Sequence, residues 1–507
     1  IKNAWQKVLM NQFHDILPGS SINPVYRDAK EFYLEAQGLA SQALLESLKE
    51  ISRKIQTEGS QKGTPLLVFN SLSWERDGIV KVTLPQEFQE GVRILDEKDN
   101  EVPCQIFASD KQGKELWFFA RKIPALGYKI YRVQKVNEVP SYPSSLKVSP
   151  TVVENQYFQV TLNPESGNII SIFDKLQKKE VVAPAASANQ LQLFEDIPDE
   201  YDAWNIQYTG RQWEVDKAEK IEIREKGPVL ASIQVRKSYL GLSKARREPT
   251  SDFPSSFFSQ EIILYDGLPR IDVLMDIDWW EDHVLLKVAF PVDVKSEKAN
   301  YEIPFASIQR PTTRNTDWER ARHEVPAIRW ADLSDGEYGV SLLNESKYGY
   351  DVKDNVLRLT LLRSPLSPDP MADKGKHRFS YSLYPHKGDW REAGTVQKGY
   401  EFNSPLLALF LDSHPGEFPP SFSFFKASPS NVILTTIKKA EDRESLILRL
   451  YESEGKASEA TLELFRKPKK IYELDLMENR LRSLPFKENA LPLKFDKYEI
   501  KTLELVF

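Results

Sequence analysis

Cysteine is almost absent from this chain of 507 residues, in which Cys104 is the only one. A single thiol excludes an intramolecular disulfide and a zinc finger held by several cysteines. It is compatible with a reducing compartment, so we expect a cytoplasmic protein. The sequence also lacks any apolar run that approaches the roughly 18 residues needed to cross a bilayer, and we therefore expect no membrane partner.

An excess of basic charge is missing as well. The chain carries 68 Lys and Arg against 74 Asp and Glu, a formal net charge of −6. Because no basic field is available to hold a polyphosphate backbone, nucleic acid is not an expected partner. The start of the chain has neither the layout of a signal peptide nor an initiator Met, and we expect that it was cut from a longer protein before Ile1.

Length and aromatic content indicate a modular protein. Single hydrophobic cores stop growing near about 250–300 residues, so 507 residues predict three or four domains. Aromatic residues make up 11% of the chain, with ten Trp. Most of these rings are expected in sheet cores, although aromatic faces also stack against sugar rings. The sequence shows no repeat of fixed period.

The first sixty residues have the pattern of helices. Apolar side chains recur at steps of three and four from Val25 to Ala43, and a shifted stripe continues to Ile55. Asn23 before Pro24 predicts the N-terminal cap of this long helix, and a shorter helix carrying Trp5 precedes it. Two helices with such wide apolar faces need a third partner. Nothing later in the chain offers one, so we expect that partner upstream.

Beyond the polar stretch 56–65 the period changes to the alternation typical of strands. Alternating segments lie at Ile79–Leu84, Ile271–Ile277, Leu357–Leu361 and Leu446–Leu450, and a hairpin is predicted from Phe158–Leu162 and Ile169–Phe173 around the turn residues 163–168. Many strands without intervening helices predict a mainly β protein of antiparallel β-sandwiches. We expect a helical-bundle remnant at 1–58, a small β-sandwich at 64–138, a large β-sandwich at 150–395 and a C-terminal β-sandwich at 400–507.

The sharpest local feature is the loop between the two predicted helices, Asn11–Ile22, which contains His14 and Asp15. An imidazole beside a carboxylate, on a loop anchored by a helix at each end, can present a metal ligand and a hydrogen-bond acceptor rigidly. No second His or carboxylate lies nearby at ligand spacing, and a His-Asp pair that caps the helix ends would give the same pattern. The residues alone leave both interpretations open.

The segment Gln12–Ile22 strongly resembles the motif that follows the catalytic domain in glycoside hydrolase family 38 α-mannosidases. The resemblance covers essentially the whole chain, in the order seen in microbial and cytosolic-type members. Further matching segments are Val68–Arg76, Ile123–Tyr128, Leu191–Asp196, Asp202–Trp204, Arg310–Thr312, Trp330–Ser334 and Tyr348–Tyr350.

This resemblance implies the C-terminal half of a zinc-dependent, retaining α-mannosidase that hydrolyses terminal α-linked mannose from glycans or oligosaccharides. In that family the catalytic domain supplies three zinc ligands, and the histidine that His14 matches supplies another. The aspartate matched by Asp15 contacts hydroxyls of the bound mannose. The nucleophile and the general acid/base lie upstream, so we assign no catalytic residue to this chain and expect it to be inactive alone. The resemblance also implies that the large sandwich is a mutarotase-like supersandwich.

Two further residues are candidate sugar contacts. Asp202 and Trp204 lie in an acidic, aromatic segment, Leu193–Trp204, where related enzymes send a loop toward the active site. A carboxylate beside a stacking ring suits a mannose subsite, but a solvated loop with Trp204 packed in a core fits equally well. Structural or surface roles are expected for the remaining histidines, and the sequence departs from its relatives around His323 and Ile328.

Two other functions stay open. The sandwiches can form a stand-alone carbohydrate-binding unit, or the large sandwich can act as a mutarotase-like sugar epimerase, which needs a His and a carboxylate that converge on its concave face. Both leave the His14 loop and the uncovered helices without a purpose. We expect the apolar surface of the first sixty residues either to form a homo-oligomer or to bind the N-terminal catalytic half of the enzyme.

Overall fold

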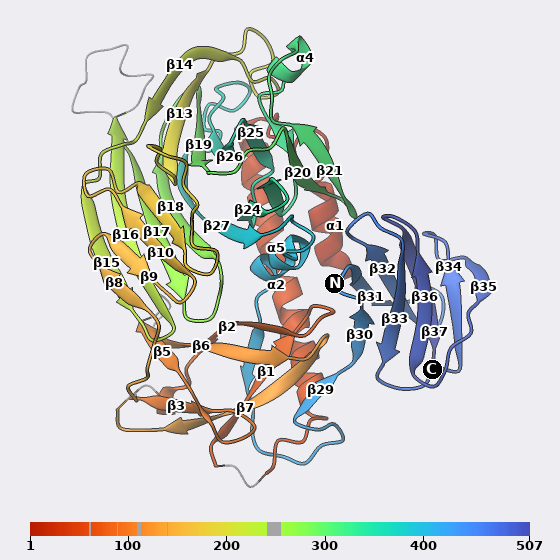
Figure 1. Cartoon of the computed structure of the whole chain (residues 1–507). Helices are drawn as coiled ribbons and strands as arrows, with labels where there is room; N and C mark the ends of the chain where they lie inside the picture. Colours follow the sequence, from red (N-terminus) through yellow and green to blue (C-terminus); the bar gives the residue numbers. More distant parts are fainter. Residues whose placement is uncertain (60–61, 89, 109–112, 139, 241–254) are drawn as a thin grey trace.

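The computed structural model describes residues 1–59, 62–88, 90–108, 113–138, 140–240 and 255–507. It is built mostly from antiparallel strands, which confirms the predicted mainly β class. Figure 1 shows the large sandwich on the left, the C-terminal sandwich on the right and the small sandwich below, with the two N-terminal helices in red behind them.

The two N-terminal helices are α1 (Lys2–Met10) and α2 (Asn23–Ser52), and they pack against each other. Pro24 lies in the first turn of α2 as predicted, but the prediction that Asn23 caps the helix is wrong. Ile22 occupies the cap position, and the Asn23 side chain donates to Asp369 at 3.3 Å instead. The side chain thus donates to a distant carboxylate, and no side chain caps the N–H groups of the first turn. No described helix has a stretch that is both long and apolar enough to cross a membrane.

Much of the apolar surface of these helices and of the loop between them faces solvent. The large exposed apolar side chains are Trp5, Leu9, Met10, Phe13, Leu17, Ile22, Tyr33, Leu34, Leu39, Leu44 and Leu45. Only Ala4, Ala29, Ala36 and Leu48 are buried apolar residues of α1 and α2. The predicted uncovered apolar face is therefore present on the surface of the chain.

The small sandwich packs two sheets around a core that includes Phe118 and Tyr131. Its larger sheet consists of β1 (Thr64–Asn70), β3 (Val92–Leu95), β4 (Glu101–Val102), β7 (Gly127–Lys135), β28 (Leu407–Phe410) and β29 (Ser421–Ser423). Its smaller sheet consists of β2 (Arg76–Thr83), β5 (Cys104–Ala108) and β6 (Lys114–Ile123).

This sheet corrects the predicted boundary at residue 400. The strands β28 and β29 pair with β1 and β7, so they belong to the small sandwich and not to the C-terminal one. The pairing is long-range, and strand β28 alone does not show from its sequence which open sheet edge it completes. The C-terminal sandwich begins at Phe425.

The large sandwich joins three sheets around one extended core, which includes Trp279 and Tyr381. The first contains β8 (Lys147–Ser149), β9 (Val152–Glu154), β10 (Phe158–Leu162), β11 (Ile169–Asp174) and β12 (Lys179–Glu180). The second contains β13 (Gln190–Asp196), β14 (Tyr208–Glu214), β19 (Val284–Pro291), β22 (Val325–Pro326), β25 (Gly349–Lys353) and β26 (Val356–Arg363).

The third and widest sheet of the large sandwich has the order β15-β16-β17-β18-β27-β24-β23-β20-β21. Its strands are β15 (Lys220–Lys226), β16 (Leu230–Leu240), β17 (Ser255–Tyr265), β18 (Ile271–Trp279), β20 (Lys298–Ile303), β21 (Ala306–Pro311), β23 (Trp330–Ser334), β24 (Tyr338–Asn344) and β27 (Gly375–Lys387). The short helix α4 (Asp317–Arg320) and the helix α5 (Thr395–Asn403) accompany it. The predicted hairpin β10–β11 and the alternating strand β18 are confirmed.

The C-terminal sandwich packs two further sheets around Leu448, Leu462 and Leu503. One sheet contains β30 (Phe425–Ser428), β33 (Ser458–Leu464) and β36 (Ala490–Phe495). The other contains β31 (Val432–Lys439), β32 (Leu446–Glu452), β34 (Lys470–Leu474), β35 (Arg480–Ser483) and β37 (Ile500–Val506).

A buried aromatic cluster joins the sandwiches. The rings of Trp330 and Trp390 lie 5.1 Å apart between their centroids. They pack with Val396 of α5 and with Ile433 and Tyr451 of the C-terminal sandwich. The large sandwich, α5 and the C-terminal sandwich therefore share one small apolar core.

Replacing Trp390 with Ala tests this core. We expect Trp390→Ala to lower the free energy of unfolding by about 3–5 kcal/mol, since a fully buried indole is lost and the surrounding groups cannot close the cavity. Urea and thermal denaturation measure the change. Trp318→Ala, at an exposed tryptophan of α4, is the matched control and should stay within about 0.5 kcal/mol of the unchanged protein. Equal effects of the two substitutions would contradict this role of Trp390.

Candidate functional site

The loop Asn11–Ile22 is held at both ends by side chains that bond backbone groups. The amide of Asn11, which is buried, donates to the carbonyl of Ala29 at 2.9 Å. The hydroxyl of Tyr26 accepts from the N–H of Ser21 at 2.7 Å and donates to the carbonyl of Asp15 at 3.4 Å. The loop is thereby anchored to α2 and presents His14 from a fixed base.

His14 and Asp15 point outward from this base. Their side chains are 75% and 52% exposed, and His14 Nε2 lies 3.6 Å from Asp15 Oδ2. The Phe13 ring lies beside the imidazole, with 4.3 Å between the ring centroids. The cap positions are Asn11 at the end of α1 and Ile22 before α2, so the alternative interpretation, in which His14 and Asp15 cap a helix end, is wrong.

The donor set of this loop fits one part of a metal site. An accessible imidazole can bind a metal through its free nitrogen, and its neighbour carboxylate can accept a hydrogen bond. No cluster of three or more His, Cys, Asp or Glu side chains suited to a metal ion exists among the described residues. A zinc ion that used His14 would need its other ligands from outside this part of the chain.

The Asp202 carboxylate is engaged within the protein. Its Oδ2 lies 3.0 Å from His283 Nε2 and accepts the N–H groups of Leu366 and Ser367 at 2.7 and 3.1 Å. Its Oδ1 is buried without a hydrogen-bond partner among the described residues. This carboxylate therefore ties its loop to the segment that follows β26, and its contact with a sugar stays a prediction.

Trp204 has the opposite environment. Its side chain is 56% exposed, and the neighbouring Tyr201 is also exposed, so the alternative that Trp204 packs into a core is wrong. The N–H of Trp204 donates to the carbonyl of Tyr201 at 2.8 Å, which closes a tight turn. The rings of Tyr201 and Trp204 are thus exposed on a turn that the contacts of Asp202 stabilise.

Arg363, at the end of β26, is the residue that fixes this turn, and sequence reasoning missed it. Its guanidinium donates to Asp196 Oδ2 at 2.6 Å and to the carbonyls of Ala203 and Asp202 at 3.0 and 2.7 Å. A further bond reaches the carbonyl of Asn205. The partners lie about 160 positions away in the sequence, so no local spacing could have indicated them.

The segment 364–374 links the two candidate loops. Asp202 bonds its first residues, while the buried Asp369 accepts the side chain of Asn23 at the start of α2. Burial raises the pKa of Tyr26, and the negative charges of Asp369, Asp15 and Asp373 raise it further against the opposing N–H of Ser21. The His14 loop and the Asp202–Trp204 turn thus lie on either side of one segment, although they do not contact each other directly in the described contacts.

A second region tests the epimerase hypothesis. A cavity of about 590 Å³ on the large sandwich is lined by residues that include His323, Tyr208 and Asp351. The buried Lys287 forms ion pairs with Glu324 at 3.2 Å and with Asp351 at 3.7 Å. Burial lowers the pKa of His323, and its ring contacts Tyr208 at 4.8 Å between centroids. The described contacts contain no His–carboxylate hydrogen bond in this cavity. The His–carboxylate pairs of the large sandwich lie elsewhere, at His283 and Asp202 (3.0 Å) and at the buried His386 and Asp332 (2.8 Å).

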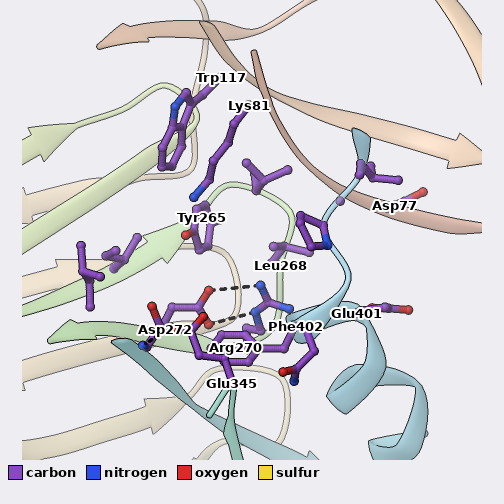
Figure 2. A pocket seen from close by; sticks show the side chains of 18 of the residues that line it. Asp77, Lys81, Trp117, Tyr265, Leu268, Arg270, Asp272, Glu345, Glu401 and Phe402 are labelled. Atoms are coloured by element: carbon purple, nitrogen blue, oxygen red, sulfur yellow. Dashed lines mark hydrogen bonds and ion pairs between the residues drawn. The ribbon is translucent and has the colours of Figure 1, made fainter. Parts of the chain in front are cut away.

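A larger cavity, of about 630 Å³, lies where the small sandwich meets the large sandwich and α5. Figure 2 shows Lys81 and Trp117 entering it from one side and the ion pair of Arg270 with Asp272 closing the other. Its lining includes neither His14 nor Asp202. This cavity is therefore distinct from the candidate loops.

Three family models match the chain. Residues 1–51 match the alpha mannosidase middle domain, residues 153–371 the glycosyl hydrolases family 38 C-terminal domain, and residues 431–503 the glycosyl hydrolases family 38 C-terminal beta sandwich domain. The matched segments contain His14, Asp202 and Trp204.

Three curated proteins match this chain over its whole length. Alpha-mannosidase 2C1 of Mus musculus is 32% identical over 519 residues, which cover 100% of this chain and 45% of that protein. Alpha-mannosidase G of Dictyostelium discoideum is 29% identical, with 100% and 48% covered, and an alpha-mannosidase of Saccharomyces cerevisiae is 27% identical, with 100% and 44% covered. The chain spans about half the length of the curated relatives it matches.

A solved structure shows the same fold. The crystal structure of an alpha-mannosidase from Enterococcus faecalis V583 superposes with a TM-score of 0.81 at 17% identity, over 99% of this chain and 63% of that one. The order of the helices and sandwiches is therefore shared with a protein whose sequence has diverged widely.

Removing the Arg363 guanidinium tests its hold on the Trp204 turn. We expect Arg363→Met to increase the amide hydrogen-exchange rates of residues 199–207 at least about tenfold, since four acceptors lose their donor and the buried Asp196 loses its counter-charge. Exchange measured by mass spectrometry reports the change. Arg236→Met, which removes an exposed ion pair with Glu222, is the control and should leave these amides unchanged. Unaltered exchange in Arg363→Met would show that the turn is held by other contacts.

Proposed function

Because this chain belongs to glycosyl hydrolase family 38, we propose that it is the C-terminal portion of a zinc-dependent, retaining α-mannosidase. The proposed reaction is hydrolysis of terminal α-linked mannose from glycans or oligosaccharides. Retaining hydrolysis uses two carboxyl groups about 5–5.5 Å apart, one as nucleophile and one as general acid/base. We place both on an upstream catalytic domain and assign no catalytic residue to this chain.

The environment of His14 is the main observation in support of the proposal. An exposed imidazole–carboxylate pair stands on a rigid loop whose neighbours Phe13, Leu17 and Ile22 are also exposed. An exposed apolar patch of this kind marks a surface that another protein surface covers. A ligand set that is incomplete and ringed by apolar groups is what one half of a shared site presents.

In this proposal His14 supplies one zinc ligand and Asp15 accepts hydrogen bonds from mannose hydroxyls. Zinc would contribute by holding sugar hydroxyls and helping to orient the ring. The anchors at Asn11 and Tyr26 hold the backbone of the loop, so that less conformational freedom of the loop is lost on ligand binding. Trp204 and Tyr201 offer ring faces to a sugar, while Asp202 positions their turn through His283 and the backbone of 366–367.

The other proposed properties follow from the same reading. The N-terminal catalytic half is the natural occupant of the apolar face of α1 and α2, with self-association into homo-oligomers as the alternative occupant. We propose a cytoplasmic location, which the single cysteine fits. A stand-alone carbohydrate-binding unit is the second candidate function, favoured by the exposed rings of Tyr201 and Trp204.

Reconstitution from two halves tests the proposed function. Hydrolysis of an aryl α-mannoside is measured for the 507-residue chain alone and mixed with the upstream half of the enzyme, with and without zinc. We expect activity only in the zinc-containing mixture. His14→Ala should reduce that activity by at least about 100-fold, because the metal loses a ligand, and equilibrium dialysis should show weaker zinc binding by the mixture.

The matched control is His414→Ala, whose imidazole bonds its neighbour Pro415 far along the chain from the His14 loop. This substitution should change neither activity nor zinc binding. Zinc-independent turnover by the 507-residue chain alone would contradict the proposal and move attention to the large sandwich.

A further inference from the structure

The cavity at the junction of the sandwiches has the walls of a ligand site. The small sandwich contributes Arg76 and Lys81 from β2 and Trp117 from β6. The large sandwich contributes strands β17, β18 and β27, and α5 contributes Glu401 to Asn403. Small-molecule pockets occur preferentially at domain interfaces and measure about 300–1,000 Å³, a range that includes this cavity of about 630 Å³.

Two cationic residues that line this cavity have N–H groups without a hydrogen-bond acceptor in the described part of the chain. Arg76 is only 6% exposed, and its Nε donates to Asn70 Oδ1 at 2.8 Å, but its Nη2 has no hydrogen-bond partner among the described residues. The Lys81 ammonium lies 3.9 Å from the centroid of the Trp117 ring and forms no ion pair within the described chain. The Lys81 ammonium can therefore donate to a ligand oxygen in the cavity, whereas the Arg76 Nη2 is enclosed by the wall.

Enclosure by the cavity walls lowers the pKa of both cations. Burial lowers the pKa of Lys81 even though its side chain is accessible within the cavity, and the charge of Arg270 adds to this effect against Asp272 and Glu115. Burial also lowers the pKa of Arg76. The Lys81 ammonium therefore gains from a ligand that supplies oxygen atoms.

Each carboxylate of the cavity, in contrast, already has at least one partner, although the described contacts use only one oxygen of Glu345. Asp272 accepts two bonds from Arg270 at 2.9 and 3.1 Å, and Glu345 Oε1 accepts the N–H of Ser380 at 2.7 Å. Four cations line the cavity against four anions, which are Arg76, Lys81, Arg270 and Arg378 against Asp77, Asp272, Glu345 and Glu401. Since the formal charges cancel, the walls do not favour a strongly anionic ligand.

Aromatic rings complete the walls. Figure 2 shows Trp117 next to Lys81 on one side of the cavity, Tyr265 between them and Arg270, and Phe402 beside Arg270. The Arg270 guanidinium lies 5.2 Å from the centroid of the Phe402 ring. A neutral ligand with many hydroxyl groups suits these walls. Its oxygens can accept from Lys81, its hydroxyl groups can donate to the unused oxygen of Glu345, and its apolar faces can contact the rings.

We propose that this junction cavity is a binding site for a short, neutral oligosaccharide, separate from the His14 loop. Lys81 donates to its hydroxyl oxygens, Glu345 accepts from its hydroxyl groups through the carboxylate oxygen that Ser380 does not use, and the aromatic walls contact its apolar faces. The choice of a mannose oligosaccharide as probe rests on the proposed function, whereas the site itself rests on the cavity. Because three parts of the chain form the walls, a bound sugar also holds the small sandwich against the large one.

Titration calorimetry with linear α-mannotriose and the 507-residue chain tests the site. We expect saturable binding that Lys81→Met weakens at least about tenfold, because three hydrogen-bond donors are lost from the cavity. Glu345→Gln, which keeps the side-chain volume, should also weaken binding and serves if Lys81→Met does not fold. Lys494→Met, at an exposed lysine of the C-terminal sandwich, should bind mannotriose like the unchanged chain.

Absence of binding to the unchanged chain, or equal affinity of Lys81→Met and Lys494→Met, would overturn the proposal. Inorganic phosphate that competes with mannotriose for the cavity would also overturn it, by showing an anion site. Failure of the two halves to hydrolyse a mannoside, with mannotriose binding retained, would remove the proposed enzymatic function and leave this site standing. Loss of mannotriose binding in His14→Ala would place the sugar at the loop instead of the cavity.

Discussion

The packing of Trp330 against Trp390 is the contact on which the arrangement of the whole chain depends. Both indoles are fully buried, and neither indole N–H has an acceptor among the described residues, so ring packing holds them, with the Arg391 guanidinium 4.3 Å from the centroid of the Trp390 ring. It brings the widest sheet of the large sandwich, α5 and the C-terminal sandwich into one core. Because α5 is fixed here, Glu401 and Phe402 are also fixed as walls of the junction cavity.

The helix α2 is then held at its two ends by different sandwiches. Asn23 at its start bonds Asp369 of the large sandwich, while Ile55, just beyond its end, packs in the core that includes Leu67 and Tyr128 of the small sandwich. The helix cannot bury its apolar face against either of them along its length. The exposed loop with His14 and Asp15 is therefore carried by a helix that is firmly placed and yet incompletely covered.

The charged side chains have different partners in the two regions that we consider functional. At the Trp204 turn, the buried acidic groups bond the Arg363 guanidinium and backbone N–H groups, which stabilises the turn while the rings of Tyr201 and Trp204 stay exposed. In the junction cavity, the carboxylates are paired while Arg76 and Lys81 keep unused donors. The first arrangement stabilises a loop, and the second leaves binding capacity inside a concave wall.

The sequence by itself determined the helices, the alternating strands and the position of the His14 loop, because these depend on local periodicity and on residues that are neighbours in the chain. Only the tertiary structure decided that β28 completes the small sandwich, that Asn23 bonds Asp369 and that Arg363 reaches Asp196 and the backbone of 202–205. The junction cavity likewise draws its walls from segments up to about 330 residues apart, between Arg76 and Leu406. Hydrogen bonds between distant segments form where folding brings a donor and an acceptor within about 3 Å. The spacing of residues along the chain does not predict which distant groups come that close.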